Sequence, residues 1–83
     1  MGDTFEVTMT GGFEFLAEGP GVVTISPSAP GMDFAFRTSG GAPDVKYGHP
    51  LHIGRSESME LAVGQRLYGR GARGYISVTT DDV

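Results

Sequence analysis

The 83-residue sequence predicts an all-β domain, a small antiparallel β-sandwich or jelly-roll-like barrel of about eight short strands. Two observations predict it. Apolar and polar residues alternate with a period of two in several short segments, as in strands that bury one face. Glycine- or proline-bearing turns separate these segments at spacings of roughly 8 to 12 residues, which is typical of sandwiches and barrels. Because no linker is long enough to divide the chain, residues 1–83 form one domain.

The first half holds four predicted strands, at 4–10, 13–17, 22–26 and 32–38. The first alternates without interruption, and the third is rich in the β-branched residues that suit a pleated surface. Gly11 and Gly12 have the freedom that a two-residue hairpin loop requires, so the second strand is expected to pair with the first. The inward-facing residues would make this half of the core rich in phenylalanine; they are Phe5, Val7, Met9, Met32, Phe34 and Phe36.

The second half resembles an antiparallel meander. Residues 39–44 form a loop, because paired glycines and a proline disfavour both helix and ladder. The further strand predictions are 45–47, turned by 48–50, then 55–63, the run Leu67-Tyr68, and 75–79. In 55–63, Met59, Leu61 and Val63 would face the core. Residues 80–83 are mostly polar and are expected to fray.

Size favours association with partners. A chain this short hides only roughly 60 per cent of its unfolded surface on folding, so its stability is thin. The sequence has no cysteine, and therefore no disulfide can support the fold. We expect a homo-oligomer, possibly a trimer.

Charge argues against several partners. The net charge of −4 disfavours nucleic acid, because phosphate binding needs a cationic surplus. Four of the six basic residues lie at Arg55, Arg66, Arg70 and Arg73, whereas 1–31 has none. This asymmetry suits head-to-tail contact or an acidic neighbour, unless it merely solubilises the surface. No run approaches the ~20 apolar residues of a membrane helix, and no leader is evident, so we expect a protein made in the cytoplasm without a membrane partner.

No residue pattern indicates an enzyme, so we expect no catalytic residue, cofactor or metal. His49 and His52 lie close in sequence, and Asp44 or Glu57 could add a carboxylate ligand. A metal-binding cupin would instead carry His-x-His followed by Glu, and two surface histidines in a turn are the simpler interpretation. The serines lack a nucleophile elbow, and a paired-carboxylate hydrolase would need a cleft for which the domain offers little volume.

The glycine-rich segment 69–74 could cradle an anion. Phosphate loops, however, lead from a strand into a helix, and here a strand follows. We therefore expect a flexible hairpin loop with exposed Arg70 and Arg73. With Tyr68 and Tyr75 beside them, these arginines suit a carboxylate-bearing protein surface.

Two phrases carry a family resemblance, Arg37-Thr38-Ser39-Gly40 and Leu67-Tyr68-Gly69-Arg70-Gly71. From Phe36 onward the chain resembles small all-β virion proteins of tailed bacteriophages, of the decoration or fibre-accessory type, in which phrases like Arg-Asn-x-Gly and Leu-Tyr-Ala-x-Gly recur. Thr38 and Gly69 depart from that pattern. The resemblance covers roughly half of the chain. It implies a virion location and a structural role: to decorate, cement or extend a phage capsid or tail.

Two functional hypotheses follow. The first is a non-enzymatic virion structural protein that contacts other copies and capsid or tail proteins. Its predicted interface residues are Tyr47, His49, Leu51, Arg66, Tyr68, Arg70, Arg73 and Tyr75. The alternative is a carbohydrate- or receptor-binding β-sandwich module, which would present its three tyrosines on one face.

Overall fold

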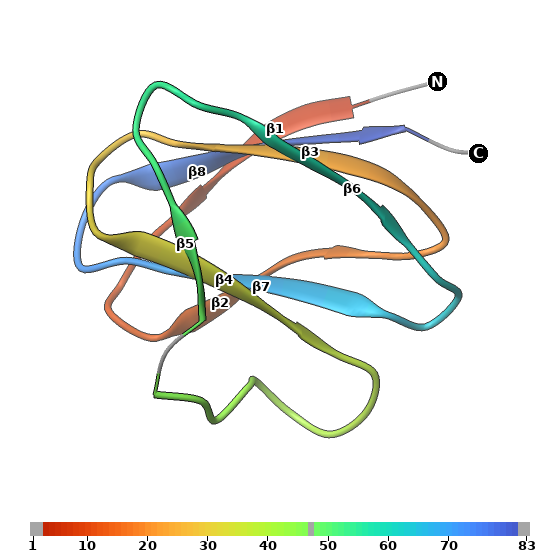
Figure 1. The fold of residues 1–83 in the computed structure, drawn as a ribbon. Coiled ribbons are helices and arrows are strands. Elements are labelled where there is room, and N and C mark those ends of the chain that lie inside the picture. The colour runs from red at the N-terminus through yellow and green to blue at the C-terminus, as the bar shows by residue number, and fades with distance from the viewer. Residues whose placement is uncertain (1–2, 47, 82–83) are drawn as a thin grey trace.

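A computed structural model describes residues 3–46 and 48–81 of the chain (Figure 1). This part contains eight strands and no helix, which confirms the predicted all-β class. The strands are β1 (Asp3–Thr8), β2 (Phe13–Glu18), β3 (Gly21–Pro27), β4 (Met32–Arg37), β5 (His49–Leu51), β6 (Glu57–Leu61), β7 (Arg66–Arg70) and β8 (Tyr75–Asp81).

The strands form two packed antiparallel sheets. Sheet A has the order β1-β8-β3-β6, and sheet B has the order β2-β7-β4-β5. The first strand thus pairs with the last, the second with the seventh, the third with the sixth and the fourth with the fifth. This is the pairing of a double Greek-key jelly roll, in which one long hairpin is folded over into two sheets. The structure therefore selects the jelly-roll form of the predicted sandwich.

The expected hairpin and meander are wrong. β1 and β2 are consecutive but belong to different sheets, where β1 pairs with β8 and β2 with β7. Among the described strands, β4 and β5 are the one sequence-adjacent pair that shares a ladder. The turns that were expected to close hairpins instead carry the chain from one sheet to the other, so the glycines at these turns are compatible with either connection.

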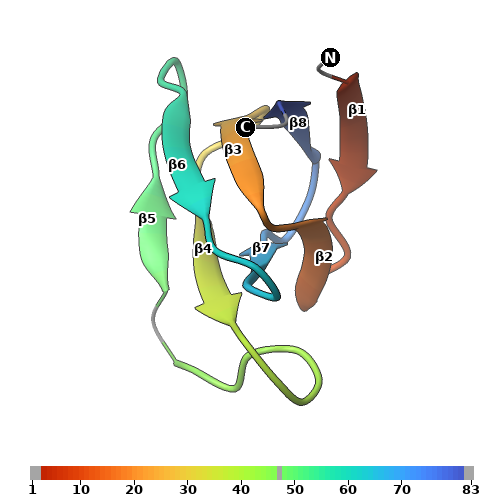
Figure 2. The same ribbon diagram turned by 90° about the vertical axis from the view of Figure 1, so that its right-hand side faces the viewer.

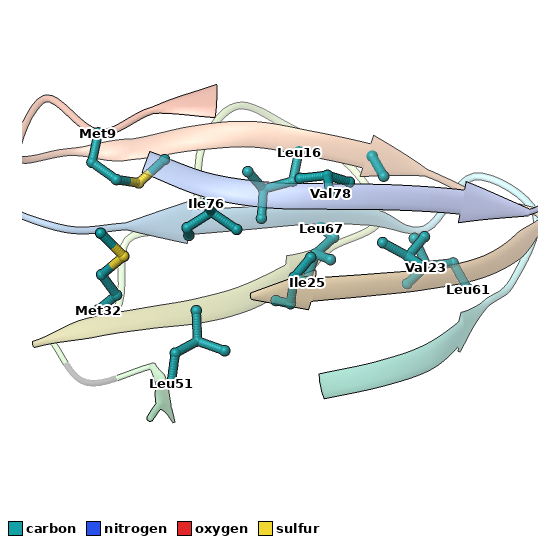
Figure 3. Packing of buried hydrophobic residues seen from close by; sticks show 11 residues of the cluster. Met9, Leu16, Val23, Ile25, Met32, Leu51, Leu61, Leu67, Ile76 and Val78 are labelled. Carbon is teal, nitrogen blue, oxygen red and sulfur yellow. The ribbon is translucent and has the colours of Figure 1, made fainter. Parts of the chain in front are cut away.

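The core is aliphatic, contrary to the expected phenylalanine-rich core. The largest fully buried side chains come from both sheets (Figure 3): Leu16, Ile25, Leu61, Leu67, Ile76 and Val78. Met9 and Met32 are also buried, as expected. Phe34 and Phe36 are only partly buried, whereas Phe5 and Phe15 are 40% and 50% exposed. Phe5 lies on the inner face of the end strand β1, whereas Phe15 lies on the outer face of sheet B, away from the core.

Three local predictions are also corrected. Val45 and Lys46 are not in a strand, and the strand of this region is β5, which includes the predicted turn residues His49 and Pro50. β6 ends at Leu61, which leaves Val63 in a turn with 83% of its surface exposed. Thr80 and Asp81 do not fray, because β8 continues to Asp81 and pairs with β3. Tyr47 and residues 82–83 lie outside the described part.

Candidate interface

The outer face of sheet B gathers arginines and aromatic rings; we call it the arginine face. Cross-strand register places Phe13 beside Arg70, Phe15 beside Tyr68 and Glu18 beside Arg66. On the other flank of β7, Asp33, Ala35 and Arg37 of β4 stand opposite the same three β7 residues. Residues directly opposite in an antiparallel ladder share one face, so these side chains form a continuous surface.

Arg70 is the central contact of the arginine face. Its Nε and Nη2 donate to Oδ1 and Oδ2 of Asp33 at 3.1 and 2.6 Å, which makes a two-pronged ion pair. Its Nη1 and Nη2 also donate to the carbonyl oxygens of Val45 and Lys46. The hydrogen bond to Asp33 raises the pKa of Arg70, so its guanidinium stays charged at every working pH.

These contacts hold the segment between β4 and β5 against the fold. Asp33 Oδ2 also accepts from the backbone N–H of Gly48 at 3.0 Å, and the Phe13 ring lies 4.3 Å from the Arg70 guanidinium carbon. The segment passes beneath sheet B in Figure 1. We call this set of contacts around Arg70 and Asp33 the arginine clasp. It corrects the prediction that Arg70 lies in a flexible, exposed hairpin loop.

β1 and β2 are the end strands of their sheets on the same side of the sandwich; we call this the open side (Figure 2). A hollow of about 260 Å³ lies here, with Phe5 and Phe15 among the residues that line it. Phe5 shares the inner face of sheet A with the buried Val78, whereas Phe15 contacts Tyr68 edge-on at 5.8 Å. The hollow is smaller than the roughly 300–1,000 Å³ of small-molecule pockets, so it suits a protein side chain better.

The outer face of sheet A has a different chemistry and is called the hydroxyl face. Thr4, Thr79, Thr24 and Ser58 form one row across its four strands. Thr4 and Thr79 are hydrogen-bonded at 2.9 Å, and Thr24 and Ser58 at 2.7 Å. A third hydroxyl pair joins Ser26 to Ser56. The charged side chains that register places on this face are acidic: Glu6, Glu60 and Asp81.

The structure brings together only part of the predicted interface. Arg66, Tyr68 and Arg70 share the arginine face, but Tyr68 is just 7% exposed and Arg70 is held in the clasp. Leu51 is 4% exposed and belongs to the core. Arg73 and Tyr75 lie away from this face, in the turn before β8 and at the start of β8. Tyr47 lies outside the described residues.

The described tyrosines do not form the shared platform required by the carbohydrate hypothesis. Tyr68 faces outward from sheet B, while Tyr75 stands opposite Thr8 on the hydroxyl face of sheet A. The two rings are therefore on opposite sides of the sandwich.

His49 is exposed and lies in an aromatic group at the opposite side from β1 and β2. Its ring centroid is 5.2 Å from that of Phe34 and 6.0 Å from that of Phe36. His52 follows β5 and is also exposed. In residues 3–46 and 48–81, no three histidine, aspartate or glutamate side chains are grouped closely enough to hold a metal ion.

The sequence analysis missed Phe13 and Phe15 as surface residues. The signal was in the run Phe15-Leu16-Ala17, because three consecutive apolar residues cannot all face one side of a regular strand. The register of β2 against β7 shifts between Phe15 and Ala17, and this bulge turns both Leu16 and Ala17 inward. Phe15 is left on the outside.

Comparison of the chain with protein-family models, with curated proteins and with solved structures found no match. The described part of the chain contains no helix capable of crossing a membrane.

Proposed function

We propose that the protein is a non-enzymatic structural component of a tailed-phage virion, which decorates, cements or extends the capsid or tail through protein contacts. The resemblance from Phe36 onward supports this role, and the jelly roll is a fold that viral capsid proteins use. Because lectins and cupins share that fold, the surface must carry the functional argument.

The supporting observation is the exposed aromatic pair at the open side. Phe5 and Phe15 are 40% and 50% exposed, and both are among the residues that line the hollow. Aromatic residues and arginine are enriched in the buried centres of protein interfaces, and Phe15 lies on the same face as Arg66. A neighbouring protein that inserts a side chain into the hollow would cover both rings. Burial of this apolar surface would stabilise the complex.

The test is the protein content of particles made by the phage or prophage that encodes the chain. Particles are purified by density gradient, and quantitative mass spectrometry measures copies of the chain per major capsid or tail protein. We expect a fixed, stoichiometric ratio in wild-type particles. Absence of the chain from them would overturn the proposal.

A surface variant then tests the contact. Phe15→Asp should keep the fold, because the ring is half exposed, yet reduce incorporation about tenfold, which corresponds to the roughly 1.4 kcal/mol expected of an interface anchor. Val63→Asp is the matched control, since Val63 is also an exposed apolar residue but lies in the turn after β6. Equal incorporation of the two variants would exclude Phe15 from the contact.

A further inference from the structure

The four end strands of the two sheets differ in how well they are protected from further pairing. β2 is interrupted by its bulge, and β5 has three residues and contains Pro50. Bulges, prolines and short length are devices that prevent an edge from pairing with another chain. β1 has six residues with a regular register and no proline, and β6 has five. β1 is therefore the longest end strand without a bulge or a proline in the described part of the chain.

The direction of the β1 backbone groups can be derived from one hydrogen bond. Met9 N–H donates to the carbonyl of Gly74 at 2.9 Å, and this pair continues the β1–β8 register. Hydrogen-bonded and non-hydrogen-bonded pairs alternate along an antiparallel ladder. The backbone N–H and C=O groups of Phe5 and Val7 therefore bond to β8, whereas those of Thr4 and Glu6 point away from the sheet.

The side chains of β1 select one symmetric register for a second copy. Two antiparallel registers pair five residues of each β1 strand and keep the inner faces of both copies on the same side of the joined sheet. One is centred on Phe5, and the other on Glu6. The second places Glu6 opposite Glu6 of the other copy, and like charges directly opposite are destabilising. The first places Phe5 opposite Phe5 and Thr4 opposite Glu6, so two rings meet and no like charges are opposite each other.

The backbone geometry permits this register, and the charges on Glu6 select it over the other. With Phe5 on the axis, the two Thr4–Glu6 pairs use the outward N–H and C=O groups and form four hydrogen bonds. Phe5 and its equivalent become a non-hydrogen-bonded pair, in which Cα atoms approach to about 4.5 Å and side chains are closest. Phe5 is 40% exposed in the single chain, so the pairing would also cover its ring.

We propose that β1 pairs antiparallel with β1 of a second copy, centred on Phe5, and joins the two A sheets into one continuous sheet. The partner is a second copy because, in this register, the strand is complementary to itself in backbone hydrogen bonding, pairs Phe5 with Phe5 and places no like charges directly opposite each other. The pairing is isologous and closed, so it produces a dimer and not a filament. It concerns the isolated chain and does not depend on the virion role.

Single-cysteine variants test the register, since the natural sequence has no cysteine. Phe5→Cys would place two thiols across the axis within the 4.4–6.8 Å Cα separation of disulfides. In the same register, the Glu6→Cys positions are about 8 Å apart and the Thr8→Cys positions about 20 Å. Under mild oxidation of dilute protein, we expect most of Phe5→Cys to become a covalent dimer and the other two variants to remain monomeric.

Three outcomes would overturn the proposal. Cross-linking of Phe5→Cys no greater than that of Thr8→Cys would exclude the pairing. Preferred cross-linking of Glu6→Cys would show another register, and preferred cross-linking of Met59→Cys would place the contact at β6, the other end strand of sheet A. Circular dichroism confirms that each variant is folded.

A proline pair tests the backbone contact without a cross-link. Sedimentation equilibrium of the native 8.7 kDa chain should give twice that mass. Glu6→Pro removes an outward N–H and should weaken dimerisation at least tenfold, while the β8 ladder persists. Ser58→Pro removes an outward N–H of β6, the other end strand of sheet A, and should leave dimerisation unchanged. A native chain that stays monomeric at millimolar concentration, or equal effects of both prolines, would refute the dimer.

The dimer proposal and the virion proposal can be refuted independently of each other. A chain that cross-links through Phe5→Cys yet is absent from particles would retain the dimer and lose the virion proposal. A chain that is present in particles but does not cross-link would retain the virion proposal and lose the dimer.

Discussion

The two outer faces of the jelly roll are stabilised by different interactions. On the arginine face, one ion pair joins directly opposite residues of β4 and β7, and Arg70 also binds the carbonyl groups of Val45 and Lys46 and so fixes a segment that has no ladder of its own. On the hydroxyl face, neutral hydroxyl pairs join neighbouring strands that the backbone already holds together. The arginine face thus uses a charged side chain to hold a segment outside the ladders, whereas the hydroxyl pairs add to strands that the ladders already join.

The largest effect is expected when the arginine clasp is removed. Arg70→Met deletes the ion pair and both carbonyl contacts, and it leaves Asp33, with 18% of its side chain exposed, paired only with the N–H of Gly48. We expect a loss of about 2–3 kcal/mol in unfolding free energy, below the value for a fully buried pair because the site is partly wet. Urea unfolding measures it.

Arg66→Met is the matched control, because Arg66 lies on the same strand and the same face of sheet B. Its expected effect is within about 0.5 kcal/mol, as for most surface substitutions. Equal losses in the two variants would mean that the clasp has no special role. Hydrogen exchange at residues 42–46 and 48 should also accelerate in Arg70→Met and not in the control.

A smaller effect is expected at the inner side of sheet B. A Cβ on Gly69 would lie 2.5 Å from Ile76 Cδ1 and 3.0 Å from Leu16 Cδ1, both in the packed core. Gly69→Ala should therefore destabilise the fold by about 1–2 kcal/mol through overpacking. Gly12→Ala is the control, since no atom lies within 4 Å of its added Cβ. Thermal unfolding compares the two, and a neutral Gly69→Ala would show that the core can adapt.

The smallest effect is expected on the hydroxyl face. A double-mutant cycle with Thr24→Val and Ser58→Ala isolates the hydroxyl contact of 2.7 Å between them. We expect a coupling free energy of about 0.2–0.5 kcal/mol, because this cross-strand pair is exposed and each hydroxyl can bond water instead. Denaturant titration of the four proteins gives the value. A coupling free energy as large as 2 kcal/mol would mean that the hydroxyl pairs stabilise the fold as much as the arginine clasp does, contrary to the expected difference between the two faces.

Local patterns predicted strands well and their partners poorly. The alternation in 4–10 and the β-branched run 22–26 correspond to β1 and β3, since side-chain period depends on a few neighbouring residues. Gly11-Gly12 has the chemistry of a hairpin loop, but β1 pairs with β8, some 70 positions away. A turn sequence describes its own backbone and does not select a distant partner.

The candidate interface was predicted only in part for the same reason. Arg66, Tyr68 and Arg70 alternate along one strand, so a common face follows from the period of two. The period of two does not show whether these side chains are available to contact another protein. Arg70 is engaged by Asp33 of β4, and the exposure of Phe15 depends on a bulge against β7. Neither contact has a local signature strong enough to identify it.

An all-β chain with short strands, turns at its glycines and no disulfide can be derived from the amino-acid sequence, because these properties depend on local side-chain period, backbone freedom and composition. The strand pairing, the aliphatic core and the open edge emerge only in the folded sandwich. Those outcomes depend on contacts between residues far apart in the chain. Such contacts form only when two sheets with their own register and twist are packed together.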